Sequence, residues 1–211
     1  EYYILVTDKY GVLPSMRREE SGAGLAAAAF MDLLSAGIIA EEKKKIEVVK
    51  DLPYELRHLQ PLYVYLREKH RYVNKIMTDW YSGSRCRQLM ELIGRSLQEA
   101  GLAKEEKGGM FRPKKVYIPV KEYKDELIAK LKAAVASEEE MEPADMALLS
   151  ILKESKNLNQ FFSKDEKTQL KRRIREIKEN PQNEKLAEMI RHITYMEEMA
   201  MYVFLTGITS N

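Results

Sequence analysis

The chain has 211 residues and a mass of 24.5 kDa, which is long enough to bury a substantial core. Its 35 basic and 33 acidic residues leave a formal net charge of only +2, so no global basic field indicates a nucleic-acid-binding protein. The single cysteine, Cys86, excludes an internal disulfide and suits a reducing compartment. No apolar run approaches the roughly 20 residues that a membrane-spanning helix needs.

The first 100 residues predict short helices separated by turns. The run YYILVTD, residues 2–8, fits either a strand or the end of a helix, and the glycine, proline and serine of residues 9–24 predict a loop. Leu25–Ser35 predicts a helix that ends at Gly37. Residues 38–49 predict two short strands around a charged turn. Further helices are predicted over residues 62–70, 72–81 and 85–100.

The stretch LQEAGLAKEEKGGMFRPKKVYIPV, residues 97–120, predicts a helix end followed by a β-hairpin. Gly101 suits a helix stop, Gly108 and Gly109 suit a tight turn, and the return run is rich in β-branched residues. Residues 30–49 have the same order of helix, Ala-Gly stop, Glu-Glu-Lys turn and return strand. We therefore predict a hairpin over residues 103–120 that projects from a helical body.

An apolar pair, Met110 and Phe111, occupies the predicted tip of this hairpin. Such a pair gains nothing from contact with water, and basic side chains follow it. These are Arg112, Lys114 and Lys115. Three interpretations are open: a tip that enters a membrane, the wing of a winged-helix DNA-binding protein, and a plain hairpin whose tip packs inside the protein or against a second copy.

The second half of the chain predicts helices almost throughout. An apolar stripe at 3-4-3 spacing predicts a helix over residues 122–136, and Pro143 suits the first position of the next helix. A capping-box pattern, SKDE, begins at Ser163 and opens a basic helix that an Asn-Pro pair ends. The last helix, over residues 183–205, has a broad apolar face and is predicted to lie in the core.

Signals for catalysis and metal binding are weak. The three histidines, His58, His70 and His192, are far apart in the chain and match no metal-binding spacing. Cys86 lies between two arginines that would lower a thiol pKa, but a helical cysteine without a positioned base favours a structural role. No glycine-rich phosphate loop is present. We therefore predict that the protein is not an enzyme and holds no metal or cofactor.

Three long blocks of the sequence resemble the Golgi phosphoprotein 3 family, in the family's order and with similar gaps. The blocks are LAAAAFMDLLSAGIIAEEKKKIEVV, CRQLMELIGRSLQEAGLAKEEKGGMFRPKKVYIPV and ADMALLSILKESKNLNQFFSKDEKTQLKRRIREI. The opening EYYILVTDKYGVLP resembles the family's first block, so the likeness spans essentially the whole chain. It implies one mainly α-helical globular domain over residues 1–211 with protruding β-hairpins. Residues 1–120 would hold helices and two hairpins, and residues 121–211 a helical half.

Eukaryotic members of this family are peripheral membrane proteins that bind phosphatidylinositol 4-phosphate and retain glycosyltransferases in the Golgi, and bacterial members also exist. The resemblance, to a member of bacterial type, implies a cytoplasmic protein that is peripheral to a membrane. The implied partner is anionic membrane lipid. Further implied partners are membrane-protein tails, in an adaptor role, and a second copy of the chain bound through the hairpin.

The family's lipid pocket uses a tryptophan and an arginine from the first loop and helix, and two arginines one helical turn apart before the hairpin. In this chain the tryptophan position falls near Met16 and Arg17, and the first arginine aligns with Ala26. Arg87 is kept, and the second paired arginine becomes Met90. The resemblance thus implies an anion-binding or phosphoinositide-binding face with loosened headgroup specificity. This face comprises Arg17, Arg18, Arg85 and Arg87. The membrane-contacting hairpin comprises Met110, Phe111, Arg112, Lys114 and Lys115.

A winged-helix-like nucleic-acid-binding regulator is the alternative function, because a helix followed by a basic hairpin also fits that architecture. The helix over residues 85–100 offers four polar side chains to a DNA groove: Arg87, Gln88, Glu91 and Arg95. The near-neutral net charge weighs against this function. In addition, two thirds of the chain do not match a winged-helix module. Nucleic acid is therefore not the expected partner.

Overall fold

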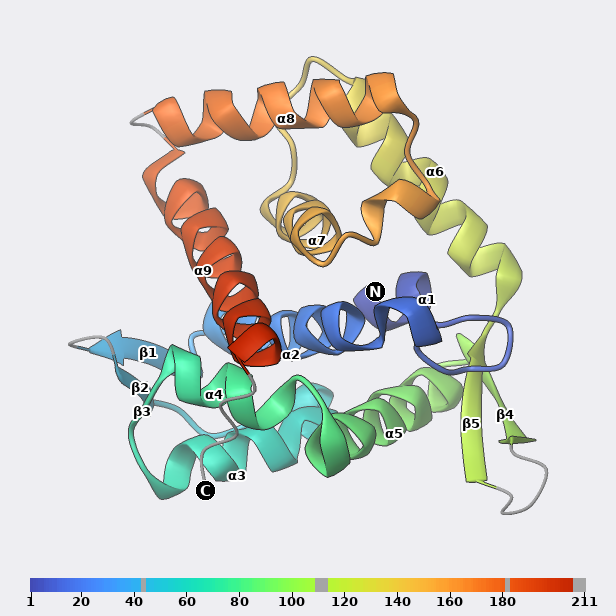
Figure 1. The fold of residues 1–211 in the computed structure, drawn as a ribbon, viewed down its shortest axis with the longest axis vertical. Coiled ribbons are helices and arrows are strands. Elements are labelled where there is room, and N and C mark those ends of the chain that lie inside the picture. The colour runs from blue at the N-terminus through green and yellow to red at the C-terminus, as the bar shows by residue number, and fades with distance from the viewer. Residues whose placement is uncertain (43–44, 109–113, 181–182, 207–211) are drawn as a thin grey trace.

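The computed structural model describes residues 1–42, 45–108, 114–180 and 183–206, except for the side chains of residues 185–186, 197 and 199–206. Figure 1 shows a helical body with a small sheet at one side and a two-stranded hairpin at the other. The helices are α1 (Tyr2–Val6), α2 (Arg18–Ser35), α3 (Gln60–Glu68), α4 (Val73–Trp80), α5 (Gly83–Glu99), α6 (Lys121–Ala136), α7 (Pro143–Glu154), α8 (Lys164–Glu179) and α9 (Glu184–Thr206). The strands are β1 (Ile39–Glu42), β2 (Lys45–Val48), β3 (Arg71–Tyr72), β4 (Ala103–Gly108) and β5 (Lys114–Pro119).

The predicted architecture, mainly helical with hairpins, is confirmed. The strands predicted over residues 38–49 are β1 and β2, and the hairpin predicted over residues 103–120 is β4 and β5. Of the two alternatives for the run YYILV, the helix is found, as α1. One local prediction is corrected, because α2 begins at Arg18, inside the segment predicted as a loop. A short third strand, β3, also pairs with β2 in antiparallel fashion.

The glycines that suggest a loop in residues 9–24 are in fact contact points of α2. A Cβ added to Gly22 would lie 2.0 Å from the carbonyl oxygen of Tyr81, at the corner between α4 and α5. A Cβ added to Gly24 would lie 2.0 Å from the hydroxyl oxygen of Tyr2. Glycine costs about 1 kcal/mol relative to alanine in a helix. The close packing that it permits here explains why the helix keeps it.

Helix α2 is the centre of the body, since it contacts α1, α4, α5, α7 and α9. Helix α9 crosses it and also contacts α4, α7 and α8. The side chains of Ile190, Ile193 and Met196 are buried, which confirms that the last helix lies in the core. Because the two central helices belong to opposite ends of the chain, residues 1–120 and residues 121–206 share one hydrophobic core.

A buried polar network joins the start of the chain to the turn after α7. The Tyr2 hydroxyl donates to Ser155 Oγ at 2.9 Å, and Asn157 Nδ2 donates to Ser21 Oγ at 3.0 Å and to the Tyr2 hydroxyl at 3.3 Å. The side chains of Ser21, Ser155 and Asn157 are fully buried. Buried polar groups of this kind are costly unless every one is paired, so the network fixes the position of α1 on α2 and α7.

The two helices that precede the hairpins end in the same way. Gly37 and Gly101 have φ values of +64° and +75°, which is the left-handed region that favours glycine. The following amides, of Ile38 and Leu102, donate to carbonyls five residues earlier at 3.0 and 2.8 Å. Both ends are therefore Schellman caps. The shared sequence order in residues 30–49 and 97–120 reflects one structural solution used twice.

The capping box predicted at Ser163 is also confirmed. Ser163 Oγ accepts from the Glu166 amide at 3.2 Å, and the Glu166 carboxylate accepts from the Ser163 amide at 2.6 Å. These two bonds satisfy amides that the first turn of α8 leaves without helical partners. None of the helices in the described ranges is both long and apolar enough to cross a membrane.

We expect Gly22→Ala to destabilise the protein, because the new methyl group meets a backbone carbonyl that cannot rotate away. Overpacking costs about 1–3 kcal/mol, and the gain in helix propensity of about 1 kcal/mol offsets only part of it. Denaturant unfolding of the purified variant measures the change. Ser35→Ala, on the exposed last turn of α2, is the matched control and should change stability by less than about 0.5 kcal/mol. Equal stability of Gly22→Ala and wild type would contradict this packing.

Cys86 lies beside the contact between Gly22 and Tyr81. Its thiol should be unreactive in the native protein. Its Sγ lies 3.4 Å from where a Gly22 Cβ would stand. Burial raises the pKa of the thiol to about 11, Glu19 adds to this, and Arg87 opposes it only weakly. At pH 8 roughly one thiol in a thousand is then ionised. A disulfide reagent should modify the unfolded chain at once and the native chain slowly. Fast reaction of the native protein would show an accessible thiolate.

Candidate functional site

The hairpin is held against α5 by one aromatic side chain. Tyr117 of β5 packs on Gly94 so closely that a Cβ at this glycine would lie 2.5 Å from the ring. The Tyr3 hydroxyl of α1 donates to the Tyr117 carbonyl at 2.9 Å. A Cβ on Gly11 would lie 2.8 Å from the same carbonyl oxygen. The hairpin is thus fixed on one side to α5 and along the β5 edge to the segment that joins α1 to α2.

A recess of about 530 Å³ lies along this β5 edge. We call it the Arg87 recess. One wall is the first half of α5, and the opposite wall is β5 with Gly11 and Val12. Its polar lining comprises Ser84, Arg87, Gln88, Glu91, Lys114 and Lys115. The bottom is closed by Tyr3 and Tyr117, both buried in the core.

Arg87 lines this recess as a cation without an ion partner among the described residues. Its side chain is exposed and makes no ion pair with any residue that the structure describes. Lys114 on the opposite wall is likewise exposed and without an ion pair in the described part of the chain. Lys115 differs, because its ammonium pairs with Glu105 at 2.8 Å. Two cations without ion partners that line one recess make it electrostatically favourable for an anion.

Arg85 points to a different neighbour from Arg87. Residues two apart on a helix are about 200° apart around its axis. Arg85 lies 3.7 Å from an Asp79 carboxylate oxygen and 5.1 Å from the centre of the Tyr65 ring. Asp79 also accepts from the Tyr65 hydroxyl at 2.7 Å and pairs with Lys75 at 2.8 Å. The structure therefore places Arg85 on the α3–α4 side rather than in the Arg87 recess.

Arg17 and Arg18 lie at the start of α2. Arg17 is half-buried, Arg18 is exposed, and neither has an ion pair among the described residues. The contact between Gly22 and Tyr81 brings the first turns of α2 next to the start of α5. The two segments that carry the predicted basic residues are thus neighbours. Neither arginine lines the Arg87 recess, so these four arginines do not share one recess.

Two of the positions where the resemblance places the other pocket residues carry buried or half-buried apolar side chains. Ala26 is only 3% exposed inside the core, so a longer polar side chain would have no route to solvent there. Met90 is half-buried and lines the Arg87 recess with an apolar side chain. Met16, near the tryptophan position, is 94% exposed. The hairpin residues Met110, Phe111 and Arg112 lie outside the described residues.

The described residues contain no group of three or more metal-ligating side chains that could hold an ion. The histidines lie in three separate places. His70 is 3.8 Å from Glu47, His192 is 3.5 Å from Glu41, and burial lowers the pKa of His58. None of these places combines a nucleophile with a positioned base. The Arg87 recess instead presents exposed cations, which suit an anionic ligand.

Sequence reasoning missed the wall formed by Tyr3, Gly11 and Val12. These residues carry no charge and no motif, and they reach the recess only because α1 packs beside β5. Gly11 suits a tight turn, and its φ is +69°. The sequence does not show that this turn contacts the Tyr117 carbonyl.

Comparison with known proteins identifies the family of the chain. Among curated proteins no match is found. Residues 1–193 match the protein family described as Golgi phosphoprotein 3 (GPP34). The match covers most of the chain, including α2, α5, the β4–β5 hairpin and the helices that enclose them. The chain therefore belongs to the Golgi phosphoprotein 3 (GPP34) family.

Proposed function

We propose that this protein is a peripheral membrane protein that binds anionic lipid headgroups at the Arg87 recess. The observation that supports the proposal most is the pair of free cations, Arg87 and Lys114, on opposite walls of a recess beside the hairpin. A phosphate ester could accept hydrogen bonds from the guanidinium and the ammonium together. Membership of the Golgi phosphoprotein 3 family supports phosphatidylinositol 4-phosphate as one such headgroup.

The proposal includes weak discrimination between headgroups. A second arginine one turn from Arg87 would form a fork that reads a phosphate by geometry, but Met90 stands there. A single arginine with a lysine attracts anions mainly by charge, with little dependence on headgroup shape. We therefore propose that other anionic lipids compete with phosphatidylinositol 4-phosphate when presented at equal charge.

The proposal places the protein at the cytoplasmic face of a membrane, as an adaptor rather than an enzyme. In that role the protein holds a membrane-protein tail close to the lipid surface. The winged-helix alternative is weakened in part by α5. Of the four polar side chains that could face a DNA groove, Glu91 and Arg95 pair with each other at 3.0 Å, which leaves Arg87 and Gln88. A recognition helix needs such side chains free to meet base edges.

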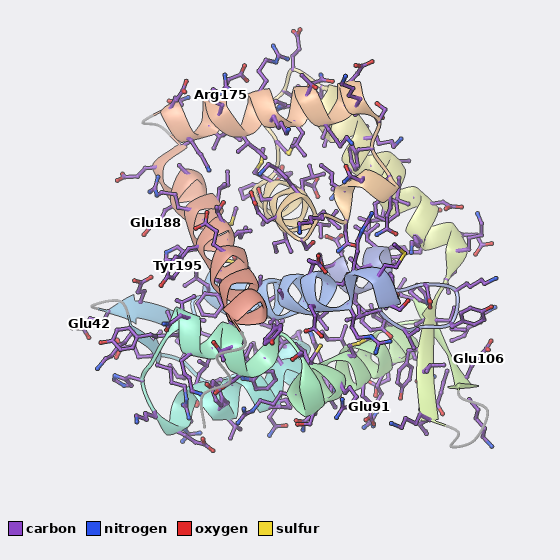
Figure 2. All side chains as sticks on the ribbon, viewed as in Figure 1. Glu42, Glu91, Glu106, Arg175, Glu188 and Tyr195 are labelled. Atoms are coloured by element: carbon purple, nitrogen blue, oxygen red, sulfur yellow. The ribbon has the colours of Figure 1, made fainter. Side chains whose placement is uncertain are left out.

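The variant Arg87→Ala tests the site. Each basic residue near an anionic membrane contributes about 1 kcal/mol, so binding to vesicles that contain phosphatidylserine should weaken about five-fold. The matched control is Arg175→Ala, because Arg175 lies on α8 at the far end of the molecule (Figure 2). Co-sedimentation at low and moderate salt measures both. Equal weakening by the two variants would show that only total charge matters.

A second test concerns the apolar pair at the hairpin tip. We propose that Met110 and Phe111 enter the lipid, which would contribute roughly 3–5 kcal/mol at most to binding. Replacing both by serine should weaken vesicle binding and leave the melting temperature unchanged. A matched change of Val64 on α3 to serine controls for loss of an exposed apolar side chain. A large fall in melting temperature of the tip variant would place the pair inside the protein or in an interface between copies.

A further inference from the structure

The hairpin has a second face that points away from α5. Side chains alternate between the faces of a strand, and Tyr117 takes the inner face. On the outer face Lys104 lies opposite Ile118, and Glu106 lies opposite Val116. Figure 2 shows Glu106 on the side of β4 remote from α5. All four line a groove of about 1020 Å³ that also touches the α1–α2 connection and the start of α6. We call this the lysine groove.

The lysine groove has an apolar floor open to water. The floor comprises Val12, Val116, Ile118 and Val120, with Tyr10 beside them. Tyr10 is 63% exposed and Val12 is 39% exposed, although both are large apolar side chains. Scattered exposed apolar residues are ordinary, but several that line one groove indicate a contact surface.

Cations surround this floor. Five lysines line the groove against two glutamates: Lys9, Lys104, Lys107, Lys114 and Lys121, with Glu106 and Glu122. Two of the lysines are engaged, since Lys121 pairs with Asp125 and the Lys9 ammonium lies 5.1 Å from the centre of the Tyr10 ring. Lys104, Lys107 and Lys114 make no ion pair with the described residues. Cations therefore outnumber carboxylates in the lining of the groove, and an anionic partner could compensate the excess positive charge.

An apolar strip rimmed by lysines matches the boundary between headgroups and acyl chains of a bilayer. Lysine stems lie along apolar surface while their ammonium groups reach phosphates, and valine and isoleucine enter the upper acyl region. The position of the groove favours the same partner. Val12, Lys114 and Val116 line both the lysine groove and the Arg87 recess. A lipid surface that covers the β5 edge would meet both.

We propose that the lysine groove is a second membrane-contacting surface, which lies on an anionic bilayer around the β5 edge while the Arg87 recess holds a headgroup. This inference rests on the proposed membrane function and adds to it the face of the hairpin that the lipid covers. The hairpin then meets the bilayer along its length as well as at its tip.

A residue of β4 and a remote residue of α8 provide the test. Lys104→Cys places a label on the lysine groove, Lys171→Cys places one on the exposed side of α8, and buried Cys86 should remain unlabelled. An environment-sensitive fluorophore is attached to each variant. Vesicles of phosphatidylcholine with phosphatidylserine should shift the emission of the label at residue 104 to shorter wavelength and leave that at residue 171 unchanged. Vesicles of phosphatidylcholine alone should shift neither.

Charge removal gives an independent readout. Lys104→Ala combined with Lys107→Ala should weaken binding to the anionic vesicles roughly 25-fold, and added salt should reduce the difference. The matched control is Lys171→Ala with Lys178→Ala on the exposed side of α8, which should bind as wild type does. Circular dichroism spectra of both double variants should match wild type, because all four side chains are exposed.

The outcomes separate this inference from the proposed function. Vesicle binding with a silent label at residue 104 would overturn the lysine groove and leave the Arg87 recess standing. Equal shifts at residues 104 and 171 would overturn the assignment of the lysine groove as the contact surface. A response at residue 104 to polyglutamate, with none to vesicles, would make the groove a site for an acidic peptide. No binding of wild type to anionic vesicles would overturn both the groove and the proposed function.

Discussion

The arrangement of the candidate site depends on how closely neighbouring elements can approach the backbone of α2. Gly22 admits the Tyr81 carbonyl, and Gly24 admits the Tyr2 hydroxyl, so the α4–α5 corner and α1 both rest on the α2 backbone. The first contact sets where α5 begins, and the second sets where α1 lies. Both α1 and α5 contact β5, α1 through the Tyr3 hydroxyl and α5 along its length. The position of the hairpin therefore follows from the two contacts with α2. A side chain at Gly22 or Gly24 would displace the α4–α5 corner or α1, and with them the elements that contact β5.

Electrostatics in this protein is local. The formal net charge of +2 predicts no long-range field, yet free cations gather on both sides of the β5 edge. Two acidic side chains beside the Arg87 recess are already engaged, Glu91 by Arg95 and Glu105 by Lys115. Pairing elsewhere thus preserves uncompensated charge where the hairpin meets α5. The same number of charges, paired at random over the surface, would leave no site for an anion.

The fold was predictable wherever a local rule determined it. Helix stops, the capping box and the hairpins follow from short patterns around Gly37, Gly101 and Ser163, because caps and turns depend on neighbouring backbone groups. The start of α2 was not predictable, since Gly22 and Gly24 read as helix breakers until their distant partners are known. The same limit applies to the candidate site. Arg87 follows from the family resemblance, but its separation from Arg85 requires knowledge of what surrounds α5.

The outward face of the hairpin combines charged and apolar side chains. Charged residues along an edge strand such as β4 normally discourage pairing with other strands, and Lys104 and Lys107 serve that purpose whether or not lipid is present. This hairpin differs from one whose outward face is charged throughout. It carries the apolar side chains Val116 and Ile118 on the same outward face as Lys104. Solubility alone would favour polar residues at both positions. Their presence beside lysines without ion partners among the described residues fits the proposed partner, a bilayer surface that is apolar and anionic at once.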